Sequence, residues 1–229
     1  MLSSVIIFAH MICLNDLSPT KINLDNFQDR ILNFWSNFQI SRSISDNAIL
    51  LRFLSFDEQT MAIKVATDIT YRDVVGLRKP EAAKPAPFYV VTAIAKVVTS
   101  DNFVVWQERD TGDWPHSIEL SGGFLRALNI QNGVLSVDDF ITDRVARDFG
   151  IAKTYLTNLE FHSLFMYDAI LEAMCCYTLN LTLSRDELIK LNPEHSFHFT
   201  KTDFNPTVDT IHGTLPLHQP SVAVWERLK

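Results

Sequence analysis

The strongest structural signal in this chain is a helix whose two ends are both marked in the sequence. Ser136 suits the N-cap position, and Asp139 completes a Ser-x-x-acid box three residues later. Gly150 suits the left-handed residue that follows a helix. Apolar residues recur between these ends at helical spacing: Val137, Phe140, Ile141, Val145 and Phe149. The pattern predicts an amphipathic helix over 137–149 with one face packed on a core.

Strand patterns surround this helix on both sides. Apolar runs at 88–99 and 103–109 flank a Ser-Asp-Asn turn and predict a hairpin, with the first run dense enough for a central strand. Further strands are expected at 156–166 and 173–183, and Ser184 with Glu187 caps a short helix over 184–191. We interpret Gly122-Gly123 as a turn that lets another group approach its amides closely. A mixed sheet between helices follows from this order of elements.

The first part of the chain has its own α+β pattern. A buried strand is expected at 5–14, a helix at 25–38, a hairpin at 48–67, and a short helix at 71–77 that ends at Gly76. Three prolines make residues 79–87 an extended linker. We therefore divide the chain into an N-terminal α+β region (1–86), a second domain (87–191) and a C-terminal extension (192–229) that holds four of the seven histidines.

The helix expected at 25–38 carries an unusually aromatic stripe. Its members fall near one helical face: Leu24, Phe27, Ile31, Phe34, Trp35 and Phe38. Either this face packs on a sheet within the chain or it is a surface for a partner. We expect burial of Phe27, Ile31, Phe34 and Trp35.

Composition narrows the classes of partner. The net charge is −7 and no cluster of Lys and Arg appears, so we expect no nucleic-acid surface. The apolar N-terminal run lacks the positive start of a signal peptide, and no run is long enough to cross a bilayer. Three cysteines form neither a disulfide framework nor a zinc spacing. We expect a cytoplasmic protein without a membrane partner.

Two segments of the second domain resemble the Nudix family. The run at 118–123 (IELSGG) is similar to the start of the family's box, and the run at 144–151 (RVARDFGI) is similar to its end. The resemblance covers roughly residues 87–191 and implies a Nudix-like α/β/α sandwich with a mixed sheet. In that family, glutamates of the box hold Mg²⁺ or Mn²⁺, and the metals activate water to cleave nucleoside diphosphates linked to another group.

The resemblance breaks down at the residues that carry the chemistry. Aligned on Gly150, Arg144 and Arg147 stand where the family has glutamates, and only Asp148 keeps an acid. A guanidinium stays protonated and has no free lone pair, so it cannot bind a metal. These arginines either form surface ion pairs at i,i+4 spacing, Asp143 with Arg147 and Arg144 with Asp148, or face the cleft and bind an anion.

Three hypotheses about function remain open. The first is a Nudix-like protein that binds a nucleotide or another phosphate-containing ligand with little or no metal-dependent hydrolysis and needs no cofactor. The second is an active, divergent diphosphohydrolase that uses Asp148 and Glu119 as catalytic and Mg²⁺- or Mn²⁺-binding residues. The third is a homodimeric interaction module, which is compatible with either of the others. The candidate ligand-binding residues are Arg109, Gly122, Gly123, Arg144 and Arg147.

Overall fold

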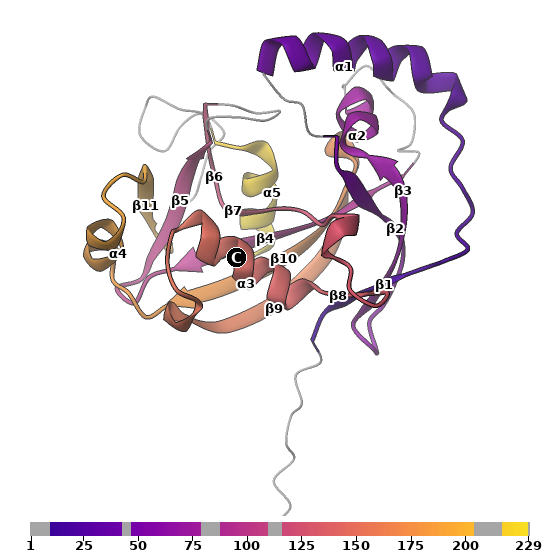
Figure 1. Ribbon diagram of the computed structural model, residues 1–229. Coiled ribbons are helices and arrows are strands. Elements are labelled where there is room, and N and C mark those ends of the chain that lie inside the picture. Colours follow the sequence, from indigo (N-terminus) through magenta and orange to yellow (C-terminus); the bar gives the residue numbers. More distant parts are fainter. Residues whose placement is uncertain (1–9, 43–46, 79–87, 110–115, 204–216, 229) are drawn as a thin grey trace, which may run out of the picture.

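The computed structural model describes residues 10–42, 47–78, 88–109, 116–203 and 217–228. Over these ranges the chain forms one mixed, mostly antiparallel sheet with helices packed against it (Figure 1). The predicted mixed α/β class is confirmed. The start of the strand expected at 5–14, the linker at 79–87 and the loop at 110–115 lie outside the described residues. No helix in the described ranges has the length and apolar character needed to cross a membrane.

The strands are β1 (Ile12–Asn15), β2 (Ile49–Asp57), β3 (Ala62–Thr70), β4 (Val90–Val98), β5 (Phe103–Arg109), β6 (Ser117–Glu119), β7 (Ser121–Phe124), β8 (Val134–Ser136), β9 (Leu156–Tyr167), β10 (Glu172–Leu181) and β11 (Phe197–Lys201). The helices are α1 (Gln28–Arg42), α2 (Tyr71–Leu77), α3 (Val137–Asp148), α4 (Arg185–Leu191) and α5 (Gln219–Arg227). Apart from β1, β6, β7, β8, β11 and α5, these elements agree with the sequence-based expectations to within a few residues. Strand β1 begins at Ile12, later than the expected start at residue 5.

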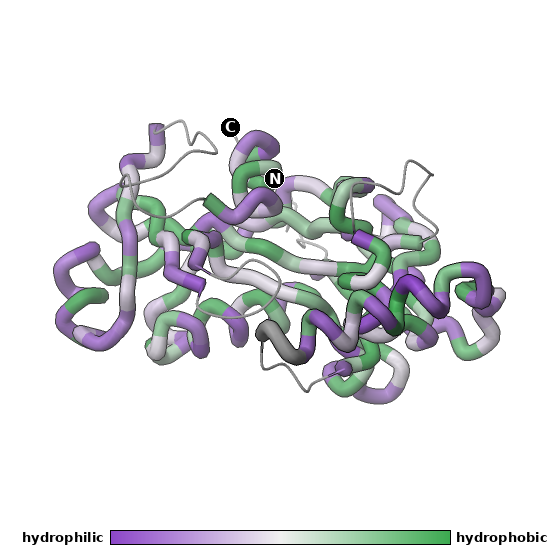
Figure 2. The backbone as a smooth tube through the Cα atoms, turned by 90° about the horizontal axis from the view of Figure 1, so that it is seen from above, coloured by the Kyte–Doolittle hydropathy of each residue, from purple (hydrophilic) through white to green (hydrophobic). Residues whose placement is uncertain are grey.

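Strand β4 is the centre of the sheet. It pairs with β10 in parallel and with β2, β5 and β7 in antiparallel fashion. Its side chains are also buried on both faces of the sheet, which explains its nearly continuous run of valine, alanine and isoleucine. Figure 2 shows apolar segments through the middle of the molecule and polar segments around its periphery.

Alternation along β4 separates two layers of core. Ala93 and Ala95 face one side of the sheet and share a buried cluster with the apolar face of α3. Ile94 faces the other side and belongs to a cluster that includes Val224 and Trp225 of α5. Helices thus cover opposite faces of the sheet. The C-terminal extension therefore supplies core residues through α5, a helix that the sequence analysis did not predict.

The caps of α3 form as the sequence predicts. The Ser136 hydroxyl accepts from the backbone N–H of Asp139 at 3.1 Å. At the other end Gly150 has a φ of +63°, and the Ile151 N–H donates to the Ala146 carbonyl at 2.9 Å. Val137, Ile141, Val145 and Phe149 are fully buried, whereas Phe140 is only partly buried.

The Gly-Gly turn was wrongly predicted. Gly122 and Gly123 lie inside β7, where they pair with Ile94 and Ala93 of β4. A Cβ on Gly122 would lie 2.4 Å from the Ala93 carbonyl oxygen, so the missing side chain lets two backbones approach. Glycine in a strand can mark either a turn or a close approach, and sequence alone does not separate the two.

The N-terminal strands extend the same sheet. The predicted hairpin forms between β2 and β3, and β1 lies between β3 and β8, parallel to the first and antiparallel to the second. Whether residues 1–86 form a separate domain stays a prediction.

The aromatic stripe of α1 packs within the chain. Ile31, Trp35 and Phe38 are buried, while Phe27 and Phe34 are only partly buried. Helix α2 covers this face, because Trp35 and Phe38 both contact the ring of Tyr71. Gly76 does not end α2 as predicted. It lies inside the helix, where a Cβ would come within 2.9 Å of the Ile31 backbone.

We expect Phe34→Ala to lower the free energy of unfolding by about 1–2 kcal/mol, less than full burial would give. The ring stacks on Phe38 at 5.6 Å but stays partly exposed. Urea denaturation measures this change. Leu32→Ala is the control, since Leu32 is 46% exposed on the same helix and should change stability by less than about 0.5 kcal/mol. Equal losses in the two variants would contradict the packing described here.

Candidate functional site

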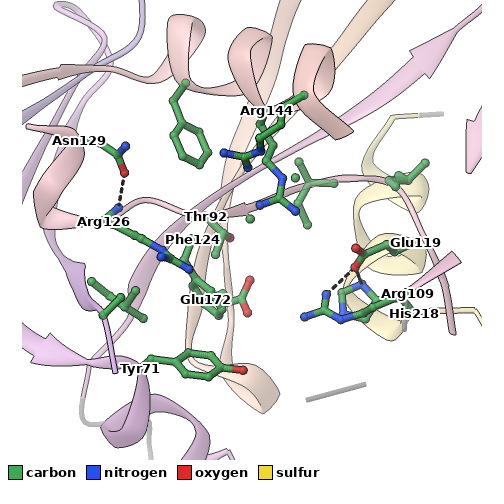
Figure 3. Close-up of a pocket in the computed structure, with 18 of the residues that line it drawn as sticks. Tyr71, Thr92, Arg109, Glu119, Phe124, Arg126, Asn129, Arg144, Glu172 and His218 are labelled. Carbon is green, nitrogen blue, oxygen red and sulfur yellow. Dashed lines mark hydrogen bonds and ion pairs between the residues drawn. The ribbon is translucent and has the colours of Figure 1, made fainter. Parts of the chain in front are cut away.

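A pocket of about 530 Å³ opens between α3, the β6–β7 segment and α2 (Figure 3). Its volume lies within the range of small-molecule sites. The charged side chains in its wall are five arginines and two glutamates: Arg78, Arg109, Arg126, Arg144, Arg147, Glu119 and Glu172. Tyr71, Phe124 and Phe140 supply aromatic surface, and Thr92, Asn129 and His218 supply further polar groups.

The fold gathers most of the residues singled out from the sequence. Arg109, Glu119, Gly122, Gly123, Arg144 and Arg147 all line this pocket. Arg144 lies over Gly123, because a Cβ on that glycine would come within 3.4 Å of Arg144 Nη1. Asp148 is not part of the lining and lies behind Arg144.

Asp148 serves as an anchor for the pocket. Its Oδ2 accepts from Arg144 Nε at 2.6 Å and from the Ser121 hydroxyl at 3.0 Å. The carboxylate is 10% exposed. Because β7 and α3 both donate to it, Asp148 fixes the Arg144 side chain at the pocket wall.

One of the two expected ion pairs on α3 does not form. Arg144 pairs with Asp148 as predicted, but Asp143 pairs with Lys153 instead of Arg147. Arg147 is 69% exposed, and its Nε lies 3.8 Å from Asp148 Oδ1. Both arginines therefore reach the pocket, Arg144 in its wall and Arg147 at its rim.

Glu119 is also committed to an arginine. Its Oε2 accepts from Arg109 Nη1 at 2.5 Å and lies 3.6 Å from His218 Nδ1. Burial raises the pKa of Glu119, and the neighbouring Arg109 opposes this shift. Burial also lowers the pKa of His218 well below its usual value, so this imidazole is neutral at neutral pH.

A second buried ion pair lies at the base of the pocket. Arg78 donates to Glu172, and its Nε donates to the Ile170 carbonyl at 2.9 Å. Both side chains are less than 8% exposed. Burial raises the pKa of Glu172 and lowers that of Arg78, while the mutual attraction of the pair opposes both shifts.

Sequence reasoning missed several pocket residues, among them Tyr71, Arg78, Arg126, Glu172 and His218. They come from α2 and its C-cap, from the chain after β7, from the start of β10 and from the C-terminal extension, so no local spacing joins them. The one available signal was weak: Glu172 is a charged residue directly before a long apolar run.

The residues described do not fit a divalent metal ion. No group of three or more His, Cys, Asp or Glu side chains in the described ranges is arranged to hold one. Glu119 and Asp148, the two candidate ligands, each accept from an arginine. A divalent cation at either carboxylate would meet the positive charge of the neighbouring guanidinium, and this repulsion opposes its binding.

No family model matches the sequence, and no curated protein matches it. Among solved structures, DR0079 from Deinococcus radiodurans aligns over 80% of this chain and 98% of its own, at 12% identity and a TM-score of 0.48. A MutT Nudix hydrolase from Burkholderia pseudomallei aligns over 61% and 97%, at 16% identity and 0.41. NrtR from Shewanella oneidensis, also solved with a 27mer DNA, aligns over 60% of each chain at 14% identity and 0.41. Likenesses this low establish neither the family nor the activity of this chain.

Proposed function

We propose that this protein binds a nucleotide or another small phosphate-containing ligand in the arginine-lined pocket, with little or no metal-dependent hydrolysis. The observation that carries the proposal is the excess of five arginines over two glutamates in the pocket wall. Each glutamate has an arginine partner and Asp148 accepts from Arg144, yet five guanidinium charges still exceed these three carboxylate charges. Guanidinium groups match the geometry of phosphate oxygens and form charge-assisted hydrogen bonds with them.

The same charges argue against hydrolysis by the Nudix mechanism. That mechanism requires clustered carboxylates to hold Mg²⁺ or Mn²⁺ and a metal to activate water. Here Arg144 and Arg147 border the pocket where such carboxylates would be needed, and their charges repel a divalent cation. The pocket residues therefore support binding of an anion but do not support its metal-dependent hydrolysis.

Binding is tested by titrating inorganic pyrophosphate into the protein in a calorimeter at low salt. We expect saturable binding that Arg144→Gln weakens by about tenfold, because one charge-assisted contact is lost. Arg185→Gln is the matched control, since Arg185 lies on α4 outside the pocket. It removes the same net charge and should leave the affinity nearly unchanged. Equal losses in both variants would refute the proposal.

Hydrolysis is tested with dinucleotides, nucleotide sugars and nucleoside triphosphates in Mg²⁺ and Mn²⁺. We expect no significant release of phosphate. Robust turnover that disappears in Asp148→Ala would establish the alternative, an active divergent hydrolase. Turnover lost only in Glu119→Ala would indicate a relocated metal site. The homodimeric alternative is separate, and the mass in solution checks it.

A further inference from the structure

The pocket follows one extended segment of chain. Six residues between Glu119 and Arg126 line it: Glu119, Leu120, Gly122, Gly123, Phe124 and Arg126. Strand β7 lies within this segment, and seven steps of extended chain span at most roughly 23–25 Å. Figure 3 shows the first and last of these residues, Glu119 and Arg126, on opposite sides of the pocket.

Each end has its own arginine. Figure 3 shows Arg109 with Glu119 and His218 on one side of the pocket, and Arg126 with Asn129 on the opposite side. Arg144 projects from α3 above the space between them. A single compact phosphate would reach only one end, so a ligand that contacts both arginines needs two separate anionic groups.

The space between the two ends is lined by an acidic side chain and a hydroxyl group. Glu172 and Thr92 lie there in Figure 3, and both are less than 6% exposed. A carboxylate has about four acceptor positions, and Arg78 occupies only part of that capacity at Glu172. Arg109 and Arg144 both stand near Glu119. Glu172 is paired with Arg78, so a phosphate beside Glu172 would meet less net positive charge than one beside Glu119. Hydroxyl groups in this position would donate to Glu172.

The N-terminal region contributes an aromatic side chain to the pocket wall near Arg126. Tyr71 lines the pocket from the start of α2, and its ring contacts Phe124 at 5.7 Å. From behind, Trp35 and Phe38 of α1 contact the same ring at 6.0 and 6.4 Å. Tyr71 is thus held in a fixed position, and the aromatic helix α1 has a positioning role for this end of the pocket.

From this distribution of charge we propose that the ligand is a sugar or other polyol with a phosphate group at each of two ends. Arg109 and Arg144 bind one phosphate, and Arg126 binds the other. Between them, the Glu172 carboxylate accepts hydrogen bonds from the hydroxyl groups of the ligand, and the Thr92 hydroxyl can both donate to them and accept from them. This inference rests on the proposed function, because it specifies the ligand of the same pocket.

The test compares inorganic phosphate, pyrophosphate and a hexose bisphosphate with phosphates on its two terminal carbons, using calorimetry on the full chain. We expect the bisphosphate to bind with one molecule per chain and at least about tenfold more tightly than either inorganic ion. Inorganic phosphate should occupy two weak sites, and the bisphosphate should displace it from both.

Variants assign the two ends. Arg126→Gln should reduce the bisphosphate to the affinity of inorganic phosphate and leave one phosphate site, while Arg144→Gln should remove the other site. Arg185→Gln again controls for the loss of net charge. If phosphate and pyrophosphate bind but the bisphosphate binds no better, or Arg126→Gln has no effect, the inference fails and the proposed function stands. If none of the three binds, the proposed function fails as well.

Discussion

Replacing Arg78 with methionine should lower the free energy of unfolding by about 3–5 kcal/mol near neutral pH. The substitution keeps an unbranched apolar stem but removes the cation that pairs with Glu172. The Glu172 carboxylate, at 5% exposure, is then buried without its partner. Losing one member of a buried pair costs more than the pair itself contributes, because the remaining charge is desolvated without compensation. Urea denaturation measures the loss.

The loss in Arg78→Met should depend on pH in a defined direction. Burial already raises the pKa of Glu172 in the folded protein, and removing Arg78 takes away the attraction that opposes this shift. Between the unfolded and folded pKa values the folded state binds more protons, so stability falls as pH rises through the folded value. The variant should therefore recover stability as pH is lowered from neutral toward the ordinary glutamate pKa.

A double variant controls for changes in packing. Arg78→Met combined with Glu172→Gln removes both charges and should be more stable at neutral pH than Arg78→Met alone, with a weaker dependence on pH. If the free energy of unfolding of Arg78→Met stays within about 1 kcal/mol of the parent protein at all pH values, the result would contradict the buried ion pair.

Gly122→Ala should destabilise the protein by about 3 kcal/mol, at the upper end of the usual cost of overpacking. The added Cβ would lie 2.4 Å from the Ala93 carbonyl oxygen and 2.8 Å from the Ile94 Cα. Both atoms belong to the backbone of β4, which neighbouring strands hold on both edges. Neither atom can rotate away, so β7 must shift and weaken its pairing.

Gly123→Ala is the matched control for this substitution. Its Cβ would meet only the end of the Arg144 side chain, at 3.4 Å, and we expect a change within about 0.5 kcal/mol. Chemical denaturation of both variants gives the comparison. Similar stabilities for the two variants would mean that Gly122 does not pack against β4 as described.

Local patterns predicted much of the fold because the forces behind them act over a few residues. The caps at Ser136 and Gly150 define α3, and the apolar runs of β4 and β10 reflect burial on both faces. The errors arose at glycines, because a glycine can mark either a turn or helix end or a close approach between two segments of backbone. Gly122 and Gly76 allow close approach to β4 and α1 rather than a turn or a helix end. Neither neighbour is visible from adjacent sequence.

The sequence by itself determined that the arginines at 144 and 147 carry no metal-binding chemistry, since a guanidinium has no lone pair to offer. Only the tertiary structure decided what surrounds them. Arg78 and Glu172 are 94 positions apart in the chain, and Arg109 and His218 are 109 positions apart (218 − 109). Their meeting in one pocket depends on strand order and on α2 and α5 packing against the sheet. Which charged residues pair over such separations depends on the order in which the strands pair in the sheet, and no local spacing in the sequence encodes that order.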